Sequence, residues 1–119
     1  GMHPSSVSEP ERFYHGLVLG LLSELYDTYE VKSNRESGYG RYDVMVIPKT
    51  DKQKDAMILE FKVCDIETES TLEDTAEAAL QQIKERQYDA ELIARGIDRK
   101  HIRHYGFAFQ GKKVLIKEE

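Results

Sequence analysis

The sequence predicts one α/β domain, and three observations support this fold class. The 119 residues suffice for one hydrophobic core but not for two. Hydrophobic residues make up 39% and charged residues 33%, proportions typical of a soluble globular domain. Segments with helical periodicity alternate with segments rich in β-branched and aromatic residues. The predicted order is a helix over 9–29, strands over 29–36, 42–47 and 56–63, a helix over 71–94, and strands over 104–109 and 113–117.

Both predicted helices carry signals at their ends or along one side. Ser8 can cap the first helix, and Phe13, Leu17 and Leu21 belong to an apolar stripe that predicts a buried side. The second helix is rich in Ala, Glu, Gln and Leu, which favour helices. Gly96 follows this segment as a predicted C-terminal cap.

The segments 42–47 and 56–63 predict strands at the centre of a sheet. Segment 56–63 is apolar at positions that face both sides of a strand, which predicts burial on both faces. The polar loop 48–55 separates the two segments and favours their pairing as a hairpin. Turns are predicted at Ser37–Gly40 and at Gln110-Gly111.

Charge and cysteine content argue against several classes of protein. The net charge of −5 argues against strong, metal-free binding of nucleic acid, although bound cations can neutralise a local acidic site. Cys64 is the only cysteine, so no intramolecular disulfide can form and a reducing, cytoplasmic setting is expected. We recognise no signal peptide, membrane span or Walker motif, so neither membrane insertion nor ATP hydrolysis is expected of this chain.

The first residues are expected to lie outside the fold. Gly1-Met2 is typical of an expression-tag remnant, and His3–Ser6 is typical of a cut linker. We therefore expect residues 1–8 to be tag remnant and linker. Residues 9–119 are expected to form a single domain excised from a longer protein.

Three charged residues stand out within the predicted strands. Glu60 and Lys62 lie two apart, so both side chains face one side of the sheet, and Asp43 is a lone acid in the preceding strand. Pairing Asp43 with Glu60 places the middle of the hairpin connection between Asp51 and Lys52, at the centre of the polar loop. Directly opposed residues have Cβ atoms about 5 Å apart. Two carboxylates at that distance repel each other unless a proton or a cation lies between them.

A divalent cation would resolve this repulsion. Mg²⁺ prefers oxygen ligands, keeps several waters and is often held by one or two carboxylates together with a phosphate. We therefore predict that Asp43 and Glu60 bind Mg²⁺ or Mn²⁺, with the backbone carbonyl of Phe61 as a further ligand. Lys62 would orient or deprotonate the attacking water, or neutralise charge on the phosphate. The alternatives are an exposed Glu-x-Lys ion pair and a structural cluster of charges without a metal.

Asp43 followed by Ile58-Leu59-Glu60-Phe61-Lys62 resembles the D…(D/E)-x-K signature of the PD-(D/E)xK nuclease superfamily. Tyr42 stands where the superfamily's name has Pro, a position that varies within it. Further segments resemble the domain of this type that lies C-terminal to an AAA-ATPase-like domain in uncharacterised prokaryotic proteins. These segments are Phe13–Gly16, Ser33–Asp43, Glu60–Lys62, Gln82-Ile83, Tyr88, Tyr105-Gly106 and Gly111–Val114.

The resemblance implies a fold, a site and an activity. The fold would be a restriction-endonuclease-like core, with a helix, a three-stranded antiparallel meander, a helix and two further strands in a mixed sheet flanked by helices. Asp43 and Glu60 would be metal ligands, and Lys62 would be the catalytic lysine. The activity would be metal-dependent hydrolysis of phosphodiester bonds in DNA or RNA.

Members of the superfamily often carry a Gln and a Tyr on the helix after the Lys strand. Tyr88 is the candidate tyrosine here, and either Gln81 or Gln82 is the candidate glutamine. The resemblance favours Gln82. In one continuous helix, at about 100° per residue, Gln81 rather than Gln82 would share a side with Tyr88. A core edge for Tyr88 and a solvated side for both glutamines is the alternative.

Three more residues are candidates for a supporting role. Arg41 shares a face with Asp43 and would contact a phosphate or pair with one of the acids. Glu11 is the nearest acid on the first helix, although a role in its first turn is the simpler interpretation. His15 is more simply a hydrogen-bonded helix residue than a ligand.

The leading hypothesis is therefore a Mg²⁺- or Mn²⁺-dependent nuclease, with nucleic acid as a weakly held partner of the isolated domain. The alternative is a catalytically inactive nuclease-fold module that binds nucleic acid or a protein partner for an associated ATPase. The sequence leaves a homodimer open. The basic group 99–103, with His101 and His104, is interpreted as a solvated loop rather than a binding patch.

Overall fold

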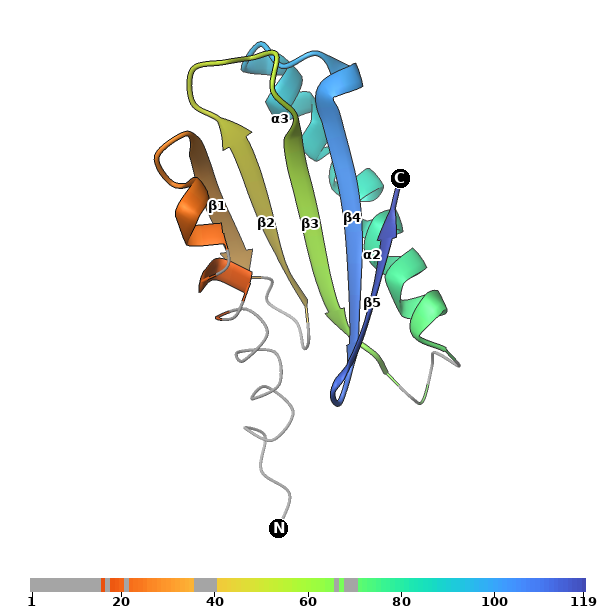
Figure 1. Cartoon of the computed structure of the whole chain (residues 1–119). Helices are drawn as coiled ribbons and strands as arrows, with labels where there is room; N and C mark the ends of the chain where they lie inside the picture. Colours follow the sequence, from red (N-terminus) through yellow and green to blue (C-terminus); the bar gives the residue numbers. More distant parts are fainter. Residues whose placement is uncertain (1–15, 17, 21, 36–40, 66, 68–70) are drawn as a thin grey trace.

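A computed structural model of the chain describes residues 16, 18–20, 22–35, 41–65, 67 and 71–119. It contains one five-stranded sheet in the order β1-β2-β3-β4-β5 (Figure 1). The strands are β1 (Tyr29–Arg35), β2 (Arg41–Pro48), β3 (Ala56–Val63), β4 (Ile102–Gln110) and β5 (Lys113–Glu118). β1, β2 and β3 form an antiparallel meander, β4 runs parallel to β3, and β5 returns antiparallel to β4. The predicted α/β class, with a mixed restriction-endonuclease-like sheet, is confirmed.

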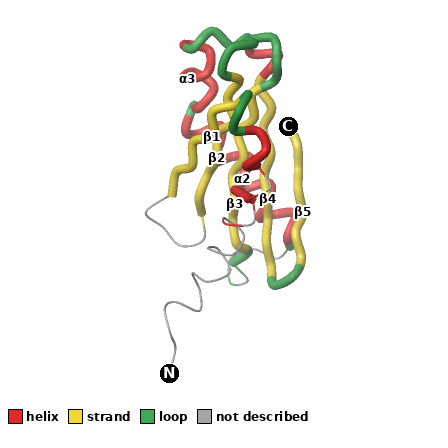
Figure 2. The backbone as a smooth tube through the Cα atoms, turned by 60° about the vertical axis from the view of Figure 1, so that its left-hand side comes forward, coloured by secondary structure: helices red, strands yellow, loops and turns green. Residues whose placement is uncertain are grey.

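The connection between the parallel strands β3 and β4 contains two α-helices and a short 3-10 helix. They are α2 (Leu72–Arg86), α3 (Tyr88–Ala94) and the short 3-10 helix η2 (Arg99–His101). Both views place α2 and α3 on the same side of the sheet (Figures 1 and 2). No helix in the described part of the chain is long and apolar enough to cross a membrane.

The single helix predicted over 71–94 is wrong, because the chain forms two helices with a break at Gln87. Thr71 caps α2 by accepting a hydrogen bond from the Asp74 N–H at 3.1 Å. Gln87 has φ 56° and ψ 39°, a left-handed conformation that ends α2 and redirects the chain into α3. No glycine or proline marks this position, so the sequence carries no signal for the break. Gly96, with φ 95°, follows the end of α3 as predicted.

The start of the predicted first helix lies outside the described residues. Residues 16, 18–20 and 22 are helical, and the 3-10 helix η1 (Ser23–Leu25) follows. A turn over 26–28 then leads into β1, so the predicted helix end at residue 29 is wrong. The predicted turn Ser37–Gly40 also lies outside the described residues, whereas the turn at Gly111, with φ 59°, is confirmed.

The two faces of the sheet are covered by separate hydrophobic clusters. On the α2/α3 face, Met45, Ile47 and Ile58 are buried against side chains from the connection after β3. On the opposite face, an aromatic cluster is packed against helical residues that precede β1. The connection contributes Leu80, Ile83, Leu92 and Ile97, and the residues before β1 are Val18, Leu19, Leu22 and Leu25. The predicted burial of β3 on both faces is confirmed.

Helix α2 lies against the backbone of β4 at Gly106. A Cβ added to Gly106 would lie 2.5 Å from the Ala76 carbonyl oxygen and 3.1 Å from Leu80 Cγ. Gly106 pairs with Glu60 in the parallel register. The missing side chain therefore allows α2 to approach the sheet beside the acidic residues of β2 and β3.

Candidate metal centre and active site

Asp43 and Glu60 lie directly opposite each other in the β2–β3 pair, and the predicted register is confirmed. Side chains alternate along a strand, so Asp43 shares a face with Met45, and Glu60 shares a face with Ile58. Met45 and Ile58 belong to the cluster under α2 and α3. The two acids therefore lie on the helix-covered face, where only 1% of Asp43 and none of Glu60 is exposed.

Lys62 lies on the same face of β3, two residues beyond Glu60. It pairs with Arg41 of β2 on one side and with Ala108 of β4 on the other. Lys62 is half-buried, whereas both acids are buried. The three side chains thus lie along one face of the sheet. Asp43 and Glu60 are inside the core, and Lys62 lies nearer the C-terminal end of β3.

Tyr88, the first residue of α3, contacts the acidic pair. Its hydroxyl donates a hydrogen bond of 2.5 Å to Oδ2 of Asp43. Burial raises the pKa of the Tyr88 hydroxyl well above its usual range, and the adjacent Asp43 carboxylate raises it further. The hydroxyl therefore keeps its proton at neutral pH and acts as a donor to Asp43.

Arg86 completes this contact from the last turn of α2. Its guanidinium acts on the Tyr88 hydroxyl and opposes the rise in its pKa, by hydrogen bonding first and by charge second. Our sequence-based prediction did not include Arg86, because basic residues are common in the last turn of any helix. The break at Gln87 brings Arg86 and Tyr88 to one place, and a continuous helix would have separated them.

The other candidate residues are placed differently. Gln81 is exposed and Gln82 is half-buried. The helical argument that grouped Gln81 with Tyr88 is wrong, because the two residues belong to different helices. Phe61 lies between Glu60 and Lys62 with its side chain in the cluster on the opposite face. Its carbonyl as a metal ligand stays a prediction.

Three candidates cannot be related to the acidic pair. Arg41 lies in β2 by its backbone, but its side chain is outside the described part of the structure. Glu11 and His15 lie wholly outside the described residues. Their proposed supporting roles stay predictions.

The described donors fit one kind of metal site better than another. Among the residues that the structure describes, no group of three or more His, Cys, Asp or Glu side chains could hold a metal. A closed, four-ligand zinc site is therefore not formed by these residues. Two opposed carboxylates suit Mg²⁺ or Mn²⁺, because such ions accept few protein oxygens and take water or phosphate as further ligands.

Comparison with known families identifies the chain. A family model described as the PD-(D/E)XK nuclease superfamily matches residues 9–119. The chain belongs to this superfamily. No curated protein and no solved structure matches the chain. PD-(D/E)XK nucleases generally use divalent metal ions, in keeping with the donors that β2 and β3 provide here.

Proposed function

We propose that this PD-(D/E)XK domain is a metal-dependent nuclease that hydrolyses phosphodiester bonds of DNA or RNA. The observation that carries the proposal is the pairing of Asp43 with Glu60 on the face that also carries Lys62. Two buried acids in adjacent strands are costly for folding, so a chemical role explains their presence better than stability does.

Each of these residues has a specific task in the proposed reaction. The carboxylates of Asp43 and Glu60 would hold Mg²⁺ or Mn²⁺, with the Phe61 carbonyl as a further oxygen. When bound, the ion would supply Lewis acidity and lower the pKa of water. The Lys62 ammonium neutralises negative charge that develops on the phosphate. Tyr88, as a hydrogen-bond donor to Asp43, fixes the orientation of that carboxylate, and Arg86 positions the Tyr88 hydroxyl.

A second candidate is a nuclease-fold module that does not cut. The near-complete burial of Asp43 and Glu60 favours it, because during hydrolysis a phosphate must reach the metal ion that these acids would hold. The net charge of −5 favours it as well. Such a module would bind nucleic acid or a protein partner for an AAA-ATPase-like domain in a longer chain, as a monomer or a homodimer.

Cleavage assays distinguish the two candidates. The domain is incubated with single-stranded, duplex and branched DNA and with RNA, in Mg²⁺ or Mn²⁺. We expect cleavage by the wild type and a loss of at least about 100-fold in Lys62→Ala and Asp43→Asn. Lys32→Ala is the matched control, since Lys32 is an exposed β1 residue that pairs with Glu91 at 3.4 Å.

Two results would contradict the nuclease proposal. Cleavage that persists at the wild-type rate in both active-site variants would come from other residues or from a contaminant. No cleavage of any substrate, together with no calorimetric binding of Mn²⁺, would favour the module that does not cut.

A further inference from the structure

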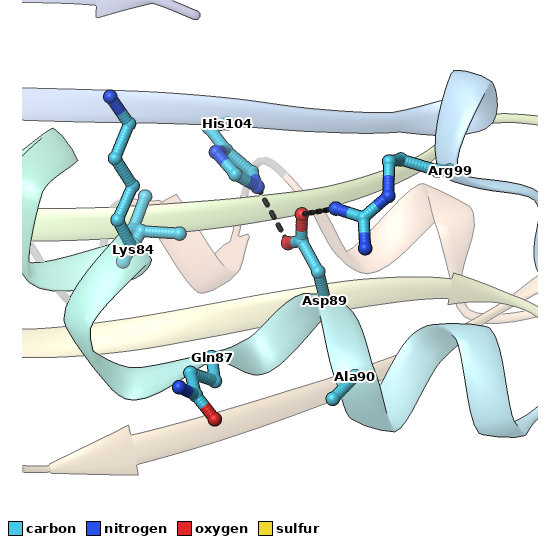
Figure 3. Close-up of a pocket in the computed structure, with 7 residues that line it drawn as sticks. Lys84, Gln87, Asp89, Ala90, Arg99 and His104 are labelled. Carbon is cyan, nitrogen blue, oxygen red and sulfur yellow. Dashed lines mark hydrogen bonds and ion pairs between the residues drawn. The ribbon is translucent and has the colours of Figure 1, made fainter.

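A cavity opens beside the junction of α2 and α3, apart from the acidic pair. Its volume is about 310 Å³, at the lower end of the range of small-molecule sites. It is lined by the charged residues Lys84 of α2, Asp89 of α3 and Arg99 of η2, together with His104 of β4 (Figure 3). The cavity is formed by the four elements together, so no short stretch of sequence predicts it.

The cavity is close to the acidic pair. His104 pairs with Ile58, which precedes Glu60 by two residues in β3. One strand spacing and two residues along a strand put the Cα atoms of His104 and Glu60 roughly 8 Å apart. Two successive residues of α3 connect the regions, because Tyr88 contacts Asp43 and Asp89 contacts His104.

Both cations of the cavity are held in ion pairs that are open to solvent. Asp89 lies 2.6 Å from Nε2 of His104, and its other oxygen lies 3.5 Å from a guanidinium nitrogen of Arg99. The Arg99 side chain is 73% exposed, so this long ion pair contributes little. Lys84 pairs closely with the carboxylate of Glu119, and each of these side chains is a little under half exposed. An anion can therefore take either cation from its present partner at small cost.

Further basic side chains lie at the same end of the sheet, and Arg103 among them faces the side opposite the cavity, because it pairs with Met57 of the aromatic cluster. Arg103 and His101 contact Asp55 at 3.2 Å and 3.1 Å, and Asp55 ends the β2–β3 loop that carries Lys52 and Lys54. The basic groups 49–54 and 99–103, separate in the sequence, thus lie side by side.

From this arrangement we infer that the cavity binds a phosphate group. Arg99 presents a planar fork that matches two phosphate oxygens, and Lys84 adds a point charge from the opposite wall. Asp89 holds the His104 ring and competes with the anion for Arg99. That the phosphate belongs to the backbone of a nucleic-acid strand rests on the proposed nuclease function. The phosphate chemistry of the cavity stands without it.

The test uses inorganic phosphate and a short single-stranded oligonucleotide, with EDTA present so that no metal contributes. Binding of phosphate is followed by NMR through the His104 ring resonances, and binding of the oligonucleotide by fluorescence anisotropy. Arg99→Ala should weaken both by roughly tenfold, the size expected for a lost charge-assisted contact. Asp89→Asn should strengthen both, because it removes the competing charge. Lys32→Ala, at the other edge of the sheet, is the matched control.

The outcomes separate this inference from the nuclease proposal. Loss of cleavage in every assay leaves the metal-free phosphate measurement unaffected. Phosphate binding without oligonucleotide binding would keep the phosphate site and overturn its assignment to a strand backbone. Equal weakening by Arg99→Ala and Lys32→Ala would overturn the site, because it would reflect net charge alone. Unchanged phosphate binding in both Arg99→Ala and Asp89→Asn, with thermal melts showing folded variants, would overturn it as well.

Discussion

Two neighbouring cross-strand pairs of β2 and β3 differ completely in chemistry. Tyr42 and Phe61 pair on one face, with ring centroids 4.6 Å apart, and they belong to the aromatic cluster. Asp43 and Glu60 pair one residue further along, on the face beneath α2 and α3. All four residues are almost completely buried. The first pair stabilises the fold, whereas the second costs stability, so the second pair points to chemistry.

The largest expected effect comes from breaking the aromatic pair. Phe61→Ala should lower the free energy of unfolding by about 3–5 kcal/mol, because it removes a buried ring and leaves a cavity. The Phe61 ring also lies 4.7 Å from that of Phe107, so the loss extends across the cluster. Urea denaturation measures the change. A loss below about 1 kcal/mol would contradict the importance of this cluster for the fold.

Breaking the acidic pair should greatly reduce cleavage but should not lower the stability of the fold. Glu60→Gln should reduce cleavage by at least about 100-fold, since a metal-binding carboxylate is lost. The variant should unfold at the same temperature as the wild type or higher, because one of two buried like charges is removed. Parallel cleavage assays and thermal melts in EDTA test this. A lower melting temperature would mean that the Glu60 carboxylate stabilises the fold.

The close approach of α2 to the sheet provides an intermediate test. Gly106→Ala should cost about 1–3 kcal/mol, because the added Cβ lies 2.5 Å from a backbone oxygen of α2 and the helix must move. Gly20→Ala is the matched control, since Gly20 is helical and exposed with nothing within 4 Å of an added Cβ. The control should be neutral or slightly stabilising. Equal effects of the two substitutions in urea denaturation would contradict the tight contact.

The Tyr88 contact should have the smallest effect, and it depends on pH. Tyr88→Phe should cost about 1–2 kcal/mol at neutral pH, through the lost hydrogen bond to the Asp43 carboxylate. Because folding raises the pKa of Tyr88 from 10.0, its contribution is complete below pH 10 and declines as the pH rises further. The stability of the wild type should therefore fall above pH 10. The stability of Tyr88→Phe should fall less over the same pH range.

Tyr105 sharpens this last comparison, because folding raises its pKa as well, first through burial and then through Glu118. Tyr105→Phe should flatten part of the same alkaline decline without affecting cleavage. Stability curves from pH 8 to pH 11 for both variants separate the two contributions. If the loss of stability at alkaline pH were the same in Tyr88→Phe as in the wild type, this would contradict the hydrogen-bond donor role assigned to Tyr88.

The sequence by itself determined the strands, their order along the chain and the pairing of Asp43 with Glu60. Strand alternation and hairpin register can be predicted from the local sequence. A shift of one residue would turn every side chain to the other face, so the apolar pattern selects one register. The residue pattern of the PD-(D/E)XK superfamily is likewise read along the chain. Because alternate residues of a strand face the same side, the two-residue spacing of Glu60 and Lys62 predicted that both lie on one face.

Only the tertiary structure decided what surrounds the acidic pair. The break at Gln87 carries no local signal, and it goes together with a contact between Tyr88 and Asp43, 45 residues earlier in the chain. Gly106, Arg86 and the cavity around Asp89 gain their importance from the same packing of α2 and α3 on the sheet. These contacts join residues far apart in sequence, and local periodicity cannot encode such contacts. The sequence thus predicted two acids in register on a buried strand pair, and the packing of the two helices decided which residues surround them.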